Sequence, residues 1–169
     1  GRIQVIKLAK RLKQEKIDKI YSSDLKRTIQ TAKIIGKEIN KEMEFTNLIR
    51  EIPNEIIEKH KNEWKDKEFN NKRLNEINGF LKKLEKTHKD KTVLLIAHAK
   101  LNRAIMSILT GIGLYEIYSF KQNHACINIL KREKVVGEIR NEVLWRIVLL
   151  NSVEHLPRKI RTSMNKKTK

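Results

Sequence analysis

The sequence predicts a three-layer α/β/α domain with a mostly parallel central sheet, and three observations support this. Short segments of strand character alternate with longer segments of helical periodicity, an order that is typical of a layered α/β fold. One of the short segments, Val93–Ala97, is apolar throughout, as in a strand that is covered on both faces. Only six glycines and two prolines interrupt the 169 residues. That length suits one domain and is enough to bury a substantial core.

The first half of the chain predicts two helices, two strands and a helical insertion. The second helix follows Ser23 and Asp24, either of which can cap a helix N-terminus. Pro53 opens the insertion, which is polar and contains His60 and Trp64. In chain order, the expected elements are a helix over Arg2–Lys16, a strand over Lys19–Ser22, a helix over Asp24–Asn40, a short strand over Glu44–Ile49 and the insertion over Pro53–Lys67.

The second half predicts two further helices and three strands. Gly111 follows the second of these helices and suits the left-handed conformation that ends many helices. The last two strands alternate apolar and polar residues, which favours an antiparallel pair at the edge of the sheet. The expected elements are a helix over Asn71–His88, the strand Val93–Ala97, a helix over Lys100–Thr110 and strands over Ala125–Lys131 and Leu144–Leu150. We place the folded domain at residues 1–156 and a disordered basic tail at 157–169.

The chain is strongly basic, with 38 Lys and Arg against 20 Asp and Glu and a formal net charge of +18. A nucleic-acid surface would also need stacking aromatic side chains, which make up only 5% of the residues and do not cluster. We therefore favour a lysine-rich solvated surface over a surface that binds nucleic acid. The apolar runs are far shorter than a membrane span, and the single cysteine, Cys126, excludes an internal disulfide. These features favour a cytoplasmic protein without a membrane partner.

Two strand-to-helix junctions each end in a residue that can bind phosphate. The strand Lys19–Ser22 leads to Arg27 in the first turn of a helix, and the strand Val93–Ala97 leads to His98. A helix N-terminus presents free N–H groups and the positive end of a dipole, so it attracts anions. If the two strands are neighbours, both residues lie at the carboxyl edge of the sheet, where ligands bind in α/β proteins. Alone, Arg27 could instead face solvent, and His98 could cap the helix or lie satisfied in the core.

Three further residues are candidates near these junctions. Glu51 follows the short strand and could protonate a leaving alkoxide, or it could form a surface salt bridge. Ser23 could donate to an anion or cap its helix. Arg103 lies about one turn beyond His98 and could support the site or pack outward. The histidines lack metal-ligand spacing and the closely spaced glycines follow a helix, so we expect neither a metal nor another cofactor.

Four segments of the chain resemble the histidine phosphatase superfamily, the phosphoglycerate-mutase-like proteins. The segment Ser22–Ala32 reads Ser-Ser-Asp-Leu-Lys-Arg-Thr-Ile-Gln-Thr-Ala and is similar to the family's Ser-Ser-x-Leu-x-Arg-Ala-x-Gln-Thr-Ala. Ile49–Glu51 resembles its Leu-Arg-Glu acid segment, and Leu94–Ala104 resembles its second-histidine strand and helix. Leu150–Leu156 is similar to its closing segment. The segments occur in the family's order, and the resemblance extends from the first residue to the end of the last segment.

The resemblance implies phosphoryl transfer through a phosphohistidine, with a small phosphorylated metabolite as the ligand. It implies that Arg27 and His98 bind the phosphate and that Glu51 is the general acid. The family's nucleophile is the histidine of an Arg-His-Gly motif that ends its first strand, and this sequence contains no Arg-His-Gly. Because Gly1–Leu12 corresponds to the family's first helix, we expect a chain that is truncated at its N-terminus and lacks that strand. Such a chain would be inactive as it stands and could self-associate through unpaired strands.

Three functions remain open on the sequence. The first is phosphomonoester hydrolysis, with mutase chemistry as a less favoured variant, by a longer form that carries the nucleophile. The second is a protein that binds phosphorylated ligands without turning them over. The missing nucleophile and Lys100 favour this alternative, since Ala99 and Lys100 stand where the family has glycines. Pro53–Ile56 replaces the family's stretch after the acid, which leaves the acid role of Glu51 and the substrate loop open. The third is a basic nucleic-acid-associated module, suggested by the charge alone.

Overall fold

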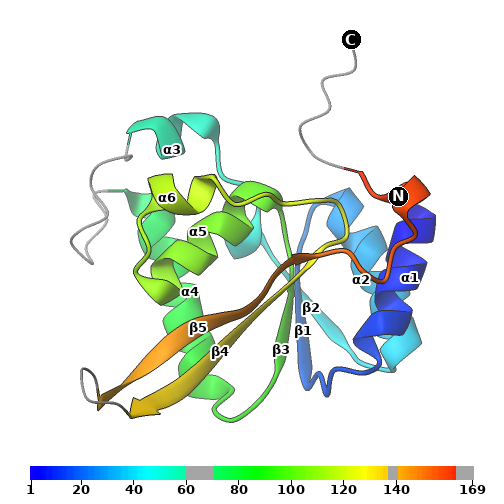
Figure 1. Cartoon of the computed structure of the whole chain (residues 1–169), viewed down its shortest axis with the longest axis horizontal. Coiled ribbons are helices and arrows are strands. Elements are labelled where there is room, and N and C mark those ends of the chain that lie inside the picture. Colours follow the sequence, from blue (N-terminus) through cyan, green and yellow to red (C-terminus); the bar gives the residue numbers. More distant parts are fainter. Residues whose placement is uncertain (60–70, 137–140, 163–169) are drawn as a thin grey trace.

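A three-stranded parallel sheet forms the middle layer of the computed structural model, which describes residues 1–59, 71–136 and 141–162 (Figure 1). Strand β1 (Lys19–Ser23) lies in the centre, between β2 (Met43–Thr46) and β3 (Val93–Ile96). Both neighbours run parallel to β1. The predicted three-layer α/β fold with a parallel sheet is therefore confirmed.

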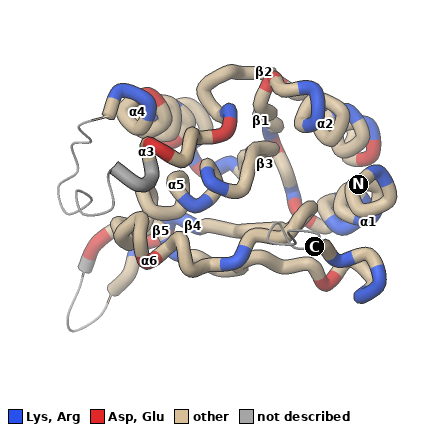
Figure 2. Tube along the Cα trace, turned by 90° about the horizontal axis from the view of Figure 1, so that it is seen from above, with Lys and Arg blue, Asp and Glu red and all other residues tan. Residues whose placement is uncertain are grey.

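Helices cover both faces of this sheet (Figure 2). Helices α1 (Arg2–Leu12) and α2 (Lys26–Ile39) pack against each other on one face. Helices α4 (Lys72–Thr87) and α5 (Ala99–Thr110) lie on the other. Each pair encloses its own apolar core, so the sheet separates two clusters of buried side chains.

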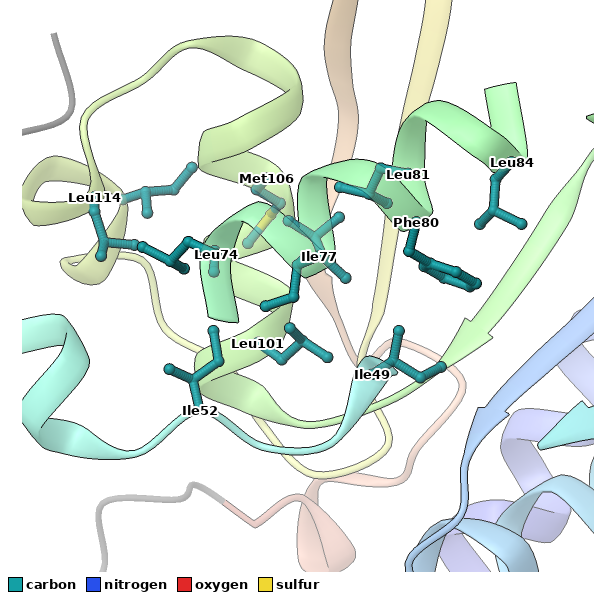
Figure 3. Close-up of a cluster of buried hydrophobic side chains, with 13 residues drawn as sticks. Ile49, Ile52, Leu74, Ile77, Phe80, Leu81, Leu84, Leu101, Met106 and Leu114 are labelled. Atoms are coloured by element: carbon teal, nitrogen blue, oxygen red, sulfur yellow. The ribbon is translucent and has the colours of Figure 1, made fainter. Parts of the chain in front are cut away.

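Strand side chains alternate between the two cores, as the pleat of a strand requires. Ile20 and Ile96 enter the core under α1 and α2, whereas Tyr21 and Leu95 pack into the core under α4 and α5. The larger core is drawn in Figure 3. There α4 presents one stripe of buried residues at helical spacing: Leu74, Ile77, Phe80, Leu81 and Leu84. Asn71 caps this helix by accepting from the N–H groups of the second and third helical residues.

Strands β4 (Ile127–Val136) and β5 (Asn141–Ser152) form the expected antiparallel pair, and both are longer than predicted. The prediction that this pair lies at the edge of the main sheet is wrong. Among the described residues, β4 pairs only with β5, and β3 pairs only with β1, so β4 and β5 form a separate sheet. The edges of β3 and β4 instead line a common cavity of about 2160 Å³. The alternation of apolar and polar residues identifies these strands, but it cannot show which strand of the main sheet, if any, they pair with.

Three predicted boundaries are also corrected. The first helix ends at Leu12 rather than Lys16, and the chain then turns so that Ile17 enters the core. In place of the predicted strand Glu44–Ile49, the structure has β2 and then the short 3-10 helix η1 (Asn47–Ile49). The hydroxyl of Thr46 caps η1 by accepting from the N–H of Leu48. The N-cap of α2 is Leu25, and it makes no side-chain cap. Ser23 and Asp24, the expected caps, have other partners.

The remaining described elements are short: α3 (Asn54–Lys59), α6 (Leu114–Tyr118) and η2 (Arg158–Ile160). Helix α3 begins the predicted insertion, whose His60, Trp64 and Lys67 lie outside the described residues. Beyond the predicted domain end at 156, Gln4 Nε2 donates to the Ile160 carbonyl at 2.6 Å. The division into a domain and a disordered tail stays a prediction. Within the described ranges, no helix is both long and apolar enough to cross a membrane.

Candidate functional site

Arg27 and His98 reach each other from neighbouring strand-to-helix junctions. Because β1 and β3 are parallel, with Ser22 opposite Ile96, their carboxyl ends meet at one edge of the sheet. Arg27 lies in the first turn of α2, after β1, and His98 is the N-cap of α5, after β3. Arg27 Nη2 lies 2.9 Å from His98 Nδ1. The structure thus brings together the two residues that the sequence placed at separate junctions.

The surroundings of His98 favour its neutral form at pH 7. The residue is buried, with 6% of its surface exposed. This burial, and then the positive charge of Arg27, lower the pKa of His98 from 6.5 to about 4. A guanidinium only donates, so the Nδ1 atom that faces Arg27 must accept. A neutral imidazole then carries its proton on Nε2, which donates to Ser23 Oγ at 3.0 Å.

Ser23 is fully buried beneath this histidine. Its carbonyl accepts from Ser22 Oγ at 3.0 Å and from Thr28 Oγ1 at 2.8 Å. Its own Oγ also accepts, at 3.4 Å, from the N–H of Leu25. Ser23 is absent from the described residues that line the cavity between β3 and β4. Its hydroxyl therefore faces His98 rather than the open space.

Glu51 is tied to the start of α5. Its Oε1 accepts from the N–H of Leu101 at 3.1 Å and from its own neighbour, the N–H of Ile52, at 3.2 Å. A carboxylate at a helix N-terminus is favoured by the helix dipole. Glu51, Arg27 and His98 line the same cavity. The carboxylate thus shares an open space with both predicted phosphate ligands.

Asp24 and Arg103 point elsewhere. The carboxylate of Asp24 binds the Arg50 guanidinium in a bidentate pair, with both distances at 2.6 Å. This pairing lowers the pKa of Asp24. Arg103 Nε donates to the Phe120 carbonyl at 2.9 Å, and its guanidinium lies 4.9 Å from the centre of the Tyr118 ring. Of the two roles that the sequence left open for Arg103, the structure has outward packing.

Sequence analysis missed a pair of interlocked amides near the cavity. Gln122 Nε2 donates to Asn128 Oδ1 at 3.1 Å, and Asn128 Nδ2 donates back to Gln122 Oε1 at 2.9 Å. Both residues line the cavity. In the sequence, Gln122 and Asn128 are visible only as polar residues near Cys126, and their spacing does not indicate that they pair with each other. Among the described residues, no group of three or more His, Cys, Asp or Glu could hold a metal ion.

Comparison with known proteins identifies the family of this chain. Residues 1–142 match the model of the histidine phosphatase superfamily (branch 1). The chain is 32% identical over 165 residues to phosphoserine phosphatase 1 of Hydrogenobacter thermophilus, covering 85% of this chain and 76% of that protein. The family match at residues 1–142 includes both strand-to-helix junctions and Glu51.

Solved structures share the fold at lower identity. A phosphoserine phosphatase variant from Entamoeba histolytica in complex with phosphoserine has a TM-score of 0.71 and 21% identity, over 93% of this chain and 84% of that one. A native mycobacterial glucosyl-3-phosphoglycerate phosphatase has a TM-score of 0.68 and 19% identity, over 90% and 86%. Together with the family match, which covers most of the chain, this shows that the protein belongs to the histidine phosphatase superfamily, branch 1.

Proposed function

We propose that this protein is part of an enzyme that hydrolyses the phosphomonoester of a small metabolite. Arg27 and His98 form the phosphate site, with Ser23 behind the His98 ring, and Glu51 is the general acid. The observation that carries the proposal is the 2.9 Å approach of Arg27 to His98 at the carboxyl edge of a parallel sheet. Two nitrogen groups at that edge, beside the N-terminus of α5, suit an anion with several oxygens.

The neutral state of His98 supports a site that waits for an anion. Burial and Arg27 both oppose a second positive charge on the ring. A phosphate dianion between the two side chains would reverse this balance, because a nearby negative charge favours the protonated imidazole. Nδ1 would then donate to one phosphoryl oxygen while Arg27 donates to others. Preorganised cationic donors of this kind stabilise charge on a transferring phosphoryl group.

Glu51 is placed for the acid role because it lines the cavity that Arg27 and His98 also line, and two main-chain N–H groups orient its carboxyl group there. In its protonated form it would transfer a proton to the ester oxygen as the P–O bond breaks. The leaving group then departs as a neutral alcohol rather than an alkoxide. The carboxylate that remains can take a proton from the water that attacks in the next step.

We propose that the covalent step uses a histidine outside the 169 residues, because these contain no Arg-His-Gly. Its ring nitrogen attacks phosphorus while the ester P–O bond breaks, giving a phosphohistidine. Water then attacks that phosphorus and breaks the N–P bond, which releases phosphate and restores the imidazole. The cavity between β3 and β4 supports the idea of a strand that carries this histidine, since apolar residues of both strands line it: Val93, Leu94, Leu95, Ile129 and Leu130.

On this proposal the 169-residue chain is inactive alone. The edges of β3 and β4 that are unpaired among the described residues are a route to self-association. The likeness to phosphoserine phosphatase 1 makes phosphoserine the first substrate to test. We also place the protein in the cytoplasm, in line with its composition. The alternative, a protein that binds phosphorylated ligands without turnover, is favoured by the same absence of an Arg-His-Gly nucleophile.

Two measurements test the proposal. The chain as printed is titrated with inorganic phosphate by calorimetry, alongside the Arg27→Ala and His98→Ala variants. We expect saturable binding that each variant weakens by about tenfold or more, the effect of one lost charge-assisted hydrogen bond. No saturable binding by the parent chain would contradict the phosphate site.

The second measurement extends the chain before Gly1 by an apolar strand that ends in Arg-His-Gly. We expect this form to hydrolyse phosphoserine or p-nitrophenyl phosphate, and a matched extension that ends in Arg-Ala-Gly to be inactive. Hydrolysis that survives His98→Ala unchanged would contradict the assigned role. Phosphate binding without hydrolysis by the extended form would favour the non-catalytic alternative.

A further inference from the structure

We propose that Ser23 is a positioning residue, which holds the His98 ring with Nε2–H turned inward and Nδ1 turned toward the anion site. Ser23 would then act on phosphate through His98 rather than by direct contact. The consequence for phosphate binding rests on the proposed function, whereas the ring orientation and tautomer do not. Three observations carry the inference: the burial of both groups, the anchoring of Ser23 and the direction of the hydrogen bonds.

The contact between Ser23 and His98 is closed to solvent. Ser23 is 0% exposed, and Ser23 Oγ lies 3.0 Å from His98 Nε2. Water therefore does not replace the serine as a partner for this ring nitrogen. A buried N–H without an acceptor is costly, so Nε2–H depends on this one oxygen.

Ser23 is itself held in place. Its carbonyl accepts from the Ser22 hydroxyl in β1 and from the Thr28 hydroxyl in α2, whose one proton is shared with the Leu25 carbonyl. The N–H of Leu25 donates to Ser23 Oγ. With one lone pair of the hydroxyl oxygen engaged by Leu25, the other remains for His98. The anchored main chain and the N–H of Leu25 thus hold the serine oxygen beside His98 Nε2.

The hydrogen bonds run in one direction from the cavity to the sheet. Arg27 donates to His98 Nδ1, and His98 Nε2–H donates to Ser23. Arg27 selects the tautomer because it only donates, and Ser23 receives the proton that this selection places on Nε2. When an anion draws the guanidinium away and His98 becomes charged, the bond from Nε2–H to Ser23 is unchanged. Ser23 would therefore keep Nδ1 aimed at the anion in both charge states.

The test is a long-range ¹H–¹⁵N spectrum of the whole chain labelled at its five histidines, recorded at pH 7 without ligand. The His98→Gln variant identifies the His98 signals. We expect an unprotonated Nδ1 and a protonated, slowly exchanging Nε2. A wild-type His98 that is protonated on Nδ1, or on both nitrogens, would overturn the proposal without any variant.

Ser23→Ala removes the acceptor, and Ser22→Ala is the matched control. Ser22 is equally buried and also loses a hydroxyl, but its oxygen contacts the Ser23 carbonyl and not His98. In that variant Thr28 and the N–H of Leu25 still hold Ser23. We expect Ser23→Ala to lose the single Nε2–H signal and Ser22→Ala to keep it. The same wild-type signal in folded Ser23→Ala would overturn the proposal.

If that variant does not fold, Ser23→Cys, which offers a weaker acceptor of similar size, should speed exchange of the Nε2 proton. Unchanged exchange in Ser23→Cys would count equally against it.

Titration with inorganic phosphate separates this inference from the proposed function. We expect Ser23→Ala to bind phosphate about tenfold more weakly than Ser22→Ala. Absence of phosphate binding by the parent chain would defeat the proposed function and leave the tautomer result standing. Normal phosphate binding with the wrong tautomer would defeat only the role of Ser23.

Discussion

Glu51 Oε1 accepts a hydrogen bond from the main-chain N–H of Leu101 at 3.1 Å, across 50 residues of sequence. The bond ties the segment after η1 to the first turn of α5, the helix that His98 begins. Glu51 therefore has a structural role in addition to the acid role proposed for it. Two substitutions separate the roles, because an amide oxygen can accept the same hydrogen bond but an amide cannot supply the proton.

Glu51→Ala should destabilise the fold, and Glu51→Gln should do so much less. Loss of a side-chain acceptor at a helix N-terminus costs about 1 kcal/mol, and the glutamine keeps an acceptor oxygen. Urea unfolding of both variants measures this difference. In the strand-extended form, Glu51→Gln should still lower the rate of phosphomonoester hydrolysis by ~10²–10⁴-fold. Equal rates for Glu51→Gln and the parent would exclude the acid role while leaving the capping role intact.

Arg27→Ala should raise the pKa of His98 from about 4. Removing the guanidinium removes the smaller of the two causes that depress the pKa, so the new value should stay below the usual 6.5 while burial persists. A ¹⁵N or ¹³C titration of the His98 ring by NMR measures the shift. Arg50→Ala is the control, because that guanidinium pairs with Asp24. A pKa that responds equally to both substitutions, or to neither, would contradict the direct effect of Arg27.

The depressed pKa of His98 should make stability depend on pH between about 6.5 and 4. In this window the unfolded chain binds a proton that the folded chain does not, so the free energy of unfolding falls as the pH falls. The contribution is complete above pH 6.5 and reaches at most ~3 kcal/mol of loss near pH 4, at 1.36 kcal/mol for each unit of pKa difference. Urea unfolding at several pH values measures this slope.

His98→Gln is the control for that slope, because glutamine does not titrate. The variant should be less sensitive to pH between 6.5 and 4, whatever its stability at pH 7. Asp24 and Glu38 also have lowered pKa values, so both proteins should lose further stability at more acidic pH. Identical slopes for the variant and the parent would show that His98 keeps an ordinary pKa.

Sequence reasoning was most successful where local pattern and sheet geometry act together. The apolar run Val93–Ala97 and the helices beside it predict a parallel strand, and parallel strands bring their carboxyl ends to one edge. Local pattern and sheet geometry are therefore enough to predict that Arg27 and His98 meet. The family motif around Ser22–Ala32 pointed to the same edge.

What the sequence could not predict depends on partners distant in the chain. Asp24 has the right residue type and position for a cap, but Arg50, 26 residues later, engages its carboxylate. The acceptor for His98 Nε2 is Ser23, 75 residues earlier, and no periodicity relates the two. The same is true of β4 and β5, whose alternation identifies strands without specifying which sheet edge they face. Such pairings follow from the tertiary structure rather than from local preference.

Two glycines of similar helical context should respond in opposite ways to alanine. A Cβ at Gly36 in α2 would lie 2.9 Å from the Lys41 carbonyl oxygen and would overlap the Met43 side chain. The carbonyl belongs to the backbone and cannot turn aside cheaply, so Gly36→Ala should destabilise the fold by about 1–3 kcal/mol. Gly79 in α4 is exposed and has nothing within 4 Å of a built Cβ. Gly79→Ala should therefore stabilise the fold by roughly 0.5–1 kcal/mol, because alanine favours the helix.

Urea unfolding of the two variants and the parent at one pH measures both effects, and each variant serves as the other's control. The two substitutions add the same methyl group and gain the same helical preference, so their difference isolates the close approach at Gly36. We expect the Gly36→Ala midpoint below that of the parent and the Gly79→Ala midpoint above it. Stabilisation by both would mean that the turn after α2, where Asn40 adopts a left-handed conformation with φ of 52°, moves away from the helix in solution. That outcome would contradict the tight packing of Lys41 and Met43 against Gly36.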